Sequence, residues 1–129
     1  MLFPVTTQYA GILGLWMVVL ALRVGKMRTS ENISLGSEGS PALFEAIRGH
    51  ANFTEWVPFT VVLMGLTEAD GLGRTWLHIA GAVLVIARLA HPFGLKSGKL
   101  LNPLRAIGAV LTSVVTVGLS GFLIWRALM

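Results

Sequence analysis

The sequence has no cysteine, a single tyrosine and few charged residues, which make up 12% of the chain. Without cysteine, neither a disulfide framework nor a thiolate metal site can form. No Ser-His-Asp arrangement, glycine-rich phosphate loop or group of histidines with metal-ligand spacing is visible, so we expect no bound metal. The scarcity of charge beside 54% hydrophobic residues lies well outside the balance of soluble domains and predicts a membrane protein.

The apolar residues form four long stretches, which predict an all-α bundle of four transmembrane helices in one domain, residues 1–129. The stretch from Met1 to Leu22 has no charged residue and no basic segment at its start, so we interpret it as a retained helix rather than a signal peptide. Ser40 before a proline is typical of a helix start. The predicted helices cover about residues 3–28, 41–67, 75–95 and 103–126.

Basic residues concentrate in the first and third connections of the predicted bundle: Arg23, Lys26, Arg28, Lys96 and Lys99. The second connection balances Arg74 against Glu68 and Asp70. The positive-inside rule therefore places the first and third connections in the cytoplasm and both termini on the other side. Because orientation in a membrane explains the net charge of +4, we expect no nucleic-acid partner.

The stretch from Arg48 to Pro58 places polar side chains where an apolar helix enters the predicted membrane. Arg48, Asn52 and Glu55 are spaced i, i+4 and i+7, so they share one face of an α-helix. Ionisable groups in a membrane span are costly, usually face the interior of a bundle and mark functional sites. An ordinary anchor at the membrane surface is the simpler interpretation of Arg48, but it leaves Glu55 unexplained.

Glu55 and Arg88, on different predicted helices, are expected to lie at the same depth. Glu55 lies seven residues past Arg48, roughly 10 Å along the helix. Arg88 lies eight residues before Lys96, roughly 12 Å along its own helix. We therefore expect Glu55 and Arg88 to form an ion pair, structural or ligand-contacting, or to share a polar cavity. His91 follows one turn nearer the cytoplasm, either as a ligand contact or as packing at the helix end.

The mouth of this cavity is predicted to be rich in cations. The side chains expected there are Lys26, Arg28, Arg48, Asn52 and Arg105. Such a lining, with one carboxylate and one amide, suits a polar ligand that carries several carboxylates and an amine. A buried cationic field also stabilises a thiolate. The rim lies at the lipid boundary, where a lipophilic second substrate can enter.

The segment R-G-H-A-N-F-T-E-W-V-P-F resembles the second-helix signature of the MAPEG family, the membrane-associated proteins in eicosanoid and glutathione metabolism. The four spaced positions of that signature are matched by Arg48, Asn52, Glu55 and Pro58. The likeness extends over nearly the whole chain, through Arg88 with His91 and through the N-P-L-R that opens the fourth apolar stretch. The compact form is most similar to the bacterial branch of the family.

The resemblance implies a homotrimer in a bacterial inner membrane, with glutathione as cofactor between neighbouring subunits and a lipophilic electrophile as substrate. Glutathione would be added to that electrophile or would reduce it. The partners implied are further copies of the chain, membrane lipid and the lipophilic substrate. By this resemblance, glutathione would contact Lys26, Arg28, Arg48, Asn52, Glu55, Arg88 and His91. Arg105 matches the arginine that stabilises the thiolate in prostaglandin E synthase-like members, so it is the expected catalytic residue.

Departures from the family pattern leave a second function open. Leu95 and Ala109 stand near positions where several eukaryotic members have tyrosines that contact glutathione, and Ala51 replaces a second arginine. The alternative is a non-catalytic lipid- or glutathione-binding membrane protein on the same scaffold. A small multidrug-type transporter also has four spans and an intramembrane glutamate. Its acid lies in the first span, however, which is uncharged here.

Overall fold

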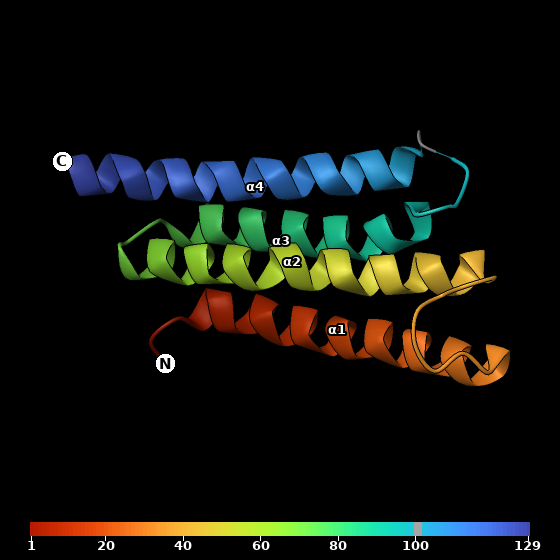
Figure 1. The fold of residues 1–129 in the computed structure, drawn as a ribbon. Helices are drawn as coiled ribbons and strands as arrows, with labels where there is room; N and C mark the ends of the chain where they lie inside the picture. Colours follow the sequence, from red (N-terminus) through yellow and green to blue (C-terminus); the bar gives the residue numbers. More distant parts are fainter. Residues whose placement is uncertain (100–101) are drawn as a thin grey trace.

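The computed structural model describes residues 1–99 and 102–129, and over these residues it consists of four antiparallel helices packed side by side (Figure 1). A 3₁₀ turn, η1 (His91–Gly94), follows the third of them. The α-helices are α1 (Pro4–Glu31), α2 (Pro41–Ala69), α3 (Arg74–Ala90) and α4 (Pro103–Leu128). The expected four-helix bundle is therefore confirmed.

Both chain termini lie at one end of the bundle, which we call the terminal end (Figure 1). The opposite end, which we call the basic end, holds the connection between α1 and α2 and the described residues that follow η1, 95–99. Both helices that begin at the basic end have side-chain caps. The Ser40 hydroxyl accepts a hydrogen bond from the Leu43 amide at 3.0 Å. The side-chain oxygen of Asn102 accepts one from the Leu104 amide at 3.0 Å, so both starts are fixed where the sequence predicts them.

The third helix is shorter than the predicted 75–95, because its last turn changes to 3₁₀ geometry at a proline. Pro92 has no N–H, so the Arg88 carbonyl four residues earlier lacks its helical hydrogen bond. The indole N–H of Trp16 in α1 donates to that carbonyl instead, at 3.1 Å. This hydrogen bond ties α1 to the end of α3.

Three of the helical segments in the described ranges are long and apolar enough to cross a membrane by length and composition: α1, Arg74–Gly94 and α4. The remaining helix, α2, has 29 residues but carries charged side chains along its length. It nevertheless runs beside the other helices (Figure 1). Large apolar side chains cover much of the outside of the bundle, such as Leu15 at 74% and Val117 at 70% exposure. An outer surface of this kind fits a lipid environment.

Two apolar clusters hold the helices together. The first joins all four helices near the terminal end, through Val5, Leu63, Met64, Leu77, Val115 and Leu119. The second is formed by Leu13, Leu20, Phe53, Val57 and Leu84. At the terminal end itself, the Glu68 carboxylate accepts hydrogen bonds from the amides of Val5 and Thr6, at 2.9 and 2.8 Å. Toward the basic end, the space between α2 and α4 is lined by charged side chains instead.

Candidate functional site

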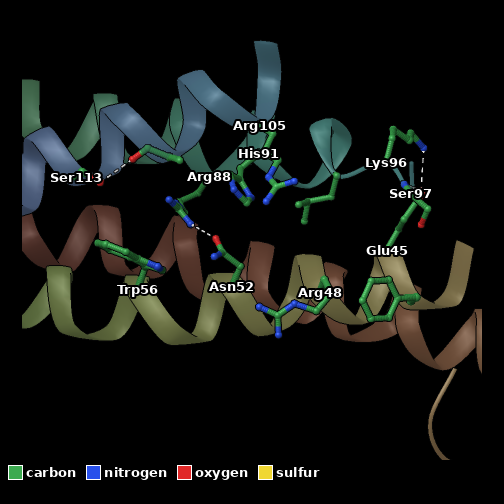
Figure 2. Close-up of a pocket in the computed structure, with 13 residues that line it drawn as sticks. Glu45, Arg48, Asn52, Trp56, Arg88, His91, Lys96, Ser97, Arg105 and Ser113 are labelled. Carbon is green, nitrogen blue, oxygen red and sulfur yellow. Dashed lines mark hydrogen bonds and ion pairs between the residues drawn. The ribbon is translucent and has the colours of Figure 1, made fainter. Parts of the chain in front are cut away.

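A cavity of about 420 Å³ lies between α2 and α4, with η1 and the segment after it as a third wall (Figure 2). Its lining consists of Phe44, Glu45, Arg48, Asn52, Trp56, Arg88, His91, Leu95, Lys96, Ser97, Arg105, Ala109 and Ser113. The lining includes four arginine or lysine side chains against one carboxylate, so the cavity is strongly cationic. Glu45 and Ser97 lie toward the basic end, and Trp56 and Ser113 lie farthest from it (Figure 2).

The Arg88 guanidinium forms a buried wall of the cavity, with only 2% of the residue exposed. Its Nε donates to the Thr112 hydroxyl at 2.8 Å, and its Nη1 donates to the Asn52 side-chain oxygen at 2.9 Å. Its Nη2 donates to the same Thr112 hydroxyl and to the Gly108 carbonyl. Among the described residues, no carboxylate pairs with this guanidinium. All of its partners are therefore neutral.

Two glycines allow α4 to lie this close to α3 and η1. A Cβ atom on Gly108 would lie 2.8 Å from the Ala87 carbonyl oxygen and 2.7 Å from the His91 Cβ. A Cβ atom on Gly94 would collide with the backbone nitrogen of Arg105. Because these neighbours are backbone or Cβ atoms, no side-chain rotation would relieve the contacts. The helix spacing at the cavity therefore requires glycine at both positions.

His91 and Arg105 continue the cavity wall from Arg88 toward the basic end (Figure 2). His91 is the first residue of η1 and is 5% exposed. Arg105 lies in the first turn of α4 and is partly exposed. The structure places these two residues in one cavity with Arg88, Arg48 and Asn52.

Glu45 is the carboxylate of the cavity, and it holds the segment after η1 against α2. One of its oxygens accepts a hydrogen bond from the Ser97 amide at 2.6 Å, and the other lies 3.3 Å from Lys96 Nζ. Glu45 lies in the amphipathic first turns of α2, before the apolar part. The Ser97 amide, together with Lys96, holds the pKa of the Glu45 carboxyl below its usual value. These contacts build the part of the cavity wall nearest the basic end.

The predicted contact between Glu55 and Arg88 is wrong. Glu55 pairs with Arg48 instead, with 3.7 Å between Oε1 and Nη2, and the side chains of Arg48 and Glu55 are 46% and 52% exposed. Residue spacing predicts the depth of Glu55 along the helix axis, but it does not determine in which direction around α2 the side chain points. Three residues of α-helix turn Glu55 about 60° away from Asn52, which is the residue that reaches Arg88.

The two predicted site residues of α1 lie outside the cavity in this chain. Arg28 donates to the carbonyls of Ile33, Ser34 and Gly36, and thereby orders the connection to α2. Lys26 is exposed to the outside of the bundle. Of the predicted site residues, the cavity thus brings together Arg48, Asn52, Arg88, His91 and Arg105.

Sequence reasoning missed several polar residues of the cavity. Ser113 could have been found, because Arg105, Ala109 and Ser113 are spaced i, i+4 and i+8 on one face of α4. Glu45 could have been found in the same way, three residues before Arg48. Thr112, which contacts Arg88 but does not line the cavity, gave no such signal, since its role depends on how α4 is rotated against α3.

The fold and the cavity define a class of protein: a bundle of membrane-length helices that encloses a cationic cavity near one end. Residues 6–125 match the MAPEG family, and the chain belongs to this family. The inner membrane protein YecN of Escherichia coli (strain K12) is 35% identical over 91 residues, which cover 70% of this chain and 69% of YecN. YecN of Escherichia coli O6:H1 (strain CFT073) shows the same identity and coverage. The chain is accordingly an integral membrane protein, and the family predicted from the Arg48–Pro58 stretch is confirmed.

Proposed function

We propose that this protein is a membrane-embedded, glutathione-dependent enzyme that transfers glutathione to a lipophilic electrophile or reduces one with it. The observation that carries the proposal is the charge of the cavity lining, where cations outnumber carboxylates four to one. Glutathione has carboxylates at both ends, an amine and a thiol, so its charges complement this lining. Membership of the MAPEG family supports the same ligand.

Arg105 is the residue we propose to activate the thiol. A guanidinium beside a thiol lowers the thiol pKa, and the resulting thiolate is the nucleophile. In transfer, a sulfur–carbon bond forms to the electrophile while the leaving group departs with its electron pair, and no covalent enzyme intermediate is needed. Arg48, Asn52, Arg88 and His91 would bind the polar parts of glutathione.

The lipophilic substrate would enter at the apolar part of the cavity. Phe44, Trp56, Leu95 and Ala109 supply apolar surface beside the charged residues. Trp56 is 40% exposed on the outside of α2, so it lies both at the cavity and at the lipid-facing surface. An apolar substrate dissolved in the bilayer would therefore meet the thiolate without crossing water.

We further propose that the active form is a homotrimer, with Lys26, Arg28 and Glu55 contributing at the contacts between copies. The side chains of the Arg48–Glu55 pair are about half-exposed, and Glu55 lies about halfway along α2 and outside the cavity lining. A charged side chain exposed to hydrocarbon costs at least about 2.5 kcal/mol, so a neighbouring copy that covers this face is favoured over lipid. Native mass spectrometry from detergent should detect three chains; a monomer that retains activity contradicts the trimer.

For localisation we propose a bacterial inner membrane, because the relative YecN is an inner membrane protein of Escherichia coli, with both termini on the non-cytoplasmic side. The surplus of basic residues at the basic end supports this orientation. Alkaline phosphatase, which is active only outside the cytoplasm, should be active when fused to the C-terminus. Activity of a cytoplasmic reporter at that position, with an inactive phosphatase, would reverse the orientation.

The proposed activity is tested with purified protein in detergent, glutathione, and either a chlorodinitrobenzene or a lipid hydroperoxide as second substrate. Arg105→Ala should lose nearly all turnover while calorimetry still detects most of the glutathione binding. Arg126→Ala removes a guanidinium at the terminal end and is the matched control, which should keep its turnover. Full turnover in Arg105→Ala would show that this residue does not stabilise the thiolate.

A non-catalytic lipid- or glutathione-binding protein is the second candidate, and one observation favours it. Leu95 and Ala109, which stand near the tyrosine positions of several family members, both line the cavity and offer no hydroxyl to a ligand. Glutathione titrations that give no heat up to millimolar concentrations, together with lipid that co-purifies in stoichiometric amount, would favour lipid binding. Heat without turnover would favour glutathione binding alone.

A further inference from the structure

We propose that the Arg88 guanidinium, positioned by the Thr112 hydroxyl, is a fixed binding site for one anionic group at the deep part of the cavity. The anionic group is a carboxylate or a thiolate. The proposal deepens the proposed function and rests on it only for the identity of the ligand. Thr112 is a positioning residue in this proposal, because it acts through Arg88.

The first support is the donor inventory of the guanidinium. Arginine has five N–H donors, two of them on Nη1. One Nη1 donor goes to the Asn52 oxygen, and the second has no partner in the part of the chain that the structure describes. Arg88 lines the cavity and its Nη1 atom points toward Asn52 of α2 (Figure 2). A donor is therefore available to a group inside the cavity.

The second support is that the nearby carboxylates are already engaged. Glu45 accepts from the Ser97 amide and pairs with Lys96. Glu55 pairs with Arg48, and Glu55 does not line the cavity. Neither can neutralise Arg88 without breaking these contacts. A buried guanidinium whose partners are all neutral is costly, and an anion from outside the chain would remove that cost.

The third support is the rigidity of the arrangement. The Thr112 hydroxyl accepts from both Nε and Nη2 of Arg88, and it donates to the Gly108 carbonyl at 2.9 Å. Thr112 is completely buried. These two hydrogen bonds to Thr112 fix the plane of the guanidinium from the α4 side, while Asn52 fixes Nη1 from the α2 side. A site held in this way binds an anion without first reorganising.

Two sources could supply the anionic group. A soluble ligand such as glutathione would bring a carboxylate or a thiolate through the basic end. A fatty acid would bring its carboxylate from the bilayer past Trp56. The shared chemistry is one anion at Arg88, and the experiment separates the two sources.

The test uses the absence of cysteine from the chain. Ser113→Cys places one thiol in the cavity lining. The full chain in nanodiscs of neutral phosphatidylcholine is treated with two methanethiosulfonates, one carrying a sulfonate and the other a trimethylammonium group. The ratio of the two rates reports the local potential, because any change in the thiol pKa affects both reagents equally.

We expect the anionic reagent to react faster than the cationic one with Ser113→Cys. Adding Arg88→Gln should lower the ratio of the anionic to the cationic rate about tenfold, which is the size expected when one charge is removed from a partly shielded cavity. Thr112→Val should also lower the ratio, whereas Thr112→Ser should keep it. Arg126→Gln is the matched control and should leave it unchanged. An unchanged ratio in a folded Arg88→Gln overturns the anion site. A shift in Arg88→Gln without one in Thr112→Val overturns the positioning role.

Protection of the thiol identifies the source of the anion. S-Methylglutathione keeps the carboxylates of glutathione and cannot react with the reagents, and decanoate represents the fatty acid. Slower labelling with either compound, lost in Arg88→Gln, supports the site and names the source. Protection by decanoate alone would contradict the proposed glutathione function while leaving the anion site intact. Protection that persists in Arg88→Gln overturns the site.

Discussion

Replacing Gly108 by alanine tests whether the close approach of α3 and α4 builds the cavity. The new Cβ atom would lie 2.7 Å from the His91 Cβ and 2.8 Å from the Ala87 carbonyl oxygen, whereas ordinary contact begins at 3.4 Å, so α4 must move by about 0.7 Å. The hydrogen bond from Arg88 Nη2 to the Gly108 carbonyl is already 3.3 Å long. A shift of this size would therefore break it.

The expected cost follows from these contacts. Overpacking of a well-packed contact costs about 1–3 kcal/mol. Loss of a hydrogen bond from a charged group costs about 1.5–3 kcal/mol more. The better helix propensity of alanine returns only about 0.5–1 kcal/mol. We therefore expect Gly108→Ala to lower the free energy of unfolding by about 2 kcal/mol or more.

Gly118→Ala is the matched control, because a Cβ atom on Gly118, in the same helix, would meet no heavy atom within 4 Å. Thermal unfolding of both variants in the same detergent, followed by circular dichroism, gives the comparison. Gly108→Ala should unfold at a lower temperature than the parent chain, and Gly118→Ala should not. If Gly108→Ala is as stable as Gly118→Ala, the helix spacing at the cavity does not depend on glycine.

Three further changes test contacts between helices. Glu68→Gln weakens the carboxylate cap on the first amides of α1, so it should cost about 1 kcal/mol and speed hydrogen exchange at those amides; unchanged exchange would refute the cap. Trp16→Phe removes the indole donor to the carbonyl that Pro92 leaves free, and should cost about 1 kcal/mol in thermal unfolding. Because the pKa of Glu45 is lowered in the folded chain, its contact with Ser97 is complete above the usual value of 4.5 and is lost as the pH falls through the lowered value. Amide exchange at Ser97, corrected for its intrinsic pH dependence, should therefore accelerate in acid and in Glu45→Gln at neutral pH, but not in a Glu38→Gln control.

The helices could be predicted from the sequence because their signals are local. A cap at Ser40 followed by proline, and a cap at Asn102 followed by proline, each determine a start without reference to any other helix. The end of α3 was harder, since the 3₁₀ turn around Pro92 depends on a donor from Trp16, far away in the chain. Local signals place helix starts, but long-range partners decide how some helices end.

The candidate site could be predicted in part for the same reason. Helical spacing on α2 brought Arg48 and Asn52 to the cavity, as expected. Spacing alone could not decide between Asn52 and Glu55 as the partner of Arg88, because both lie on the same broad face of the helix. The choice depends on how α2 is rotated against its neighbours, and that rotation is set by packing. The hydrogen bonding of Arg88 to the Thr112 hydroxyl depends in the same way on the rotation of α4.

The distribution of charge along the bundle connects its orientation to its cavity. The terminal end holds two basic residues, Arg74 and Arg126, and two acidic ones, Glu68 and Asp70. The other basic and acidic residues lie between the middle of the bundle and the basic end, so the entire net charge of +4 is there. The positive-inside rule then predicts that this end faces the cytoplasm, where soluble anions are available. The same surplus of positive charge attracts an anion toward the cavity. The low-dielectric protein around the opening concentrates the electric field there, and this field raises the local concentration of anions. Reversing the sign of Lys99, an exposed cation outside the cavity lining, should accordingly slow anion entry more than it changes anion affinity.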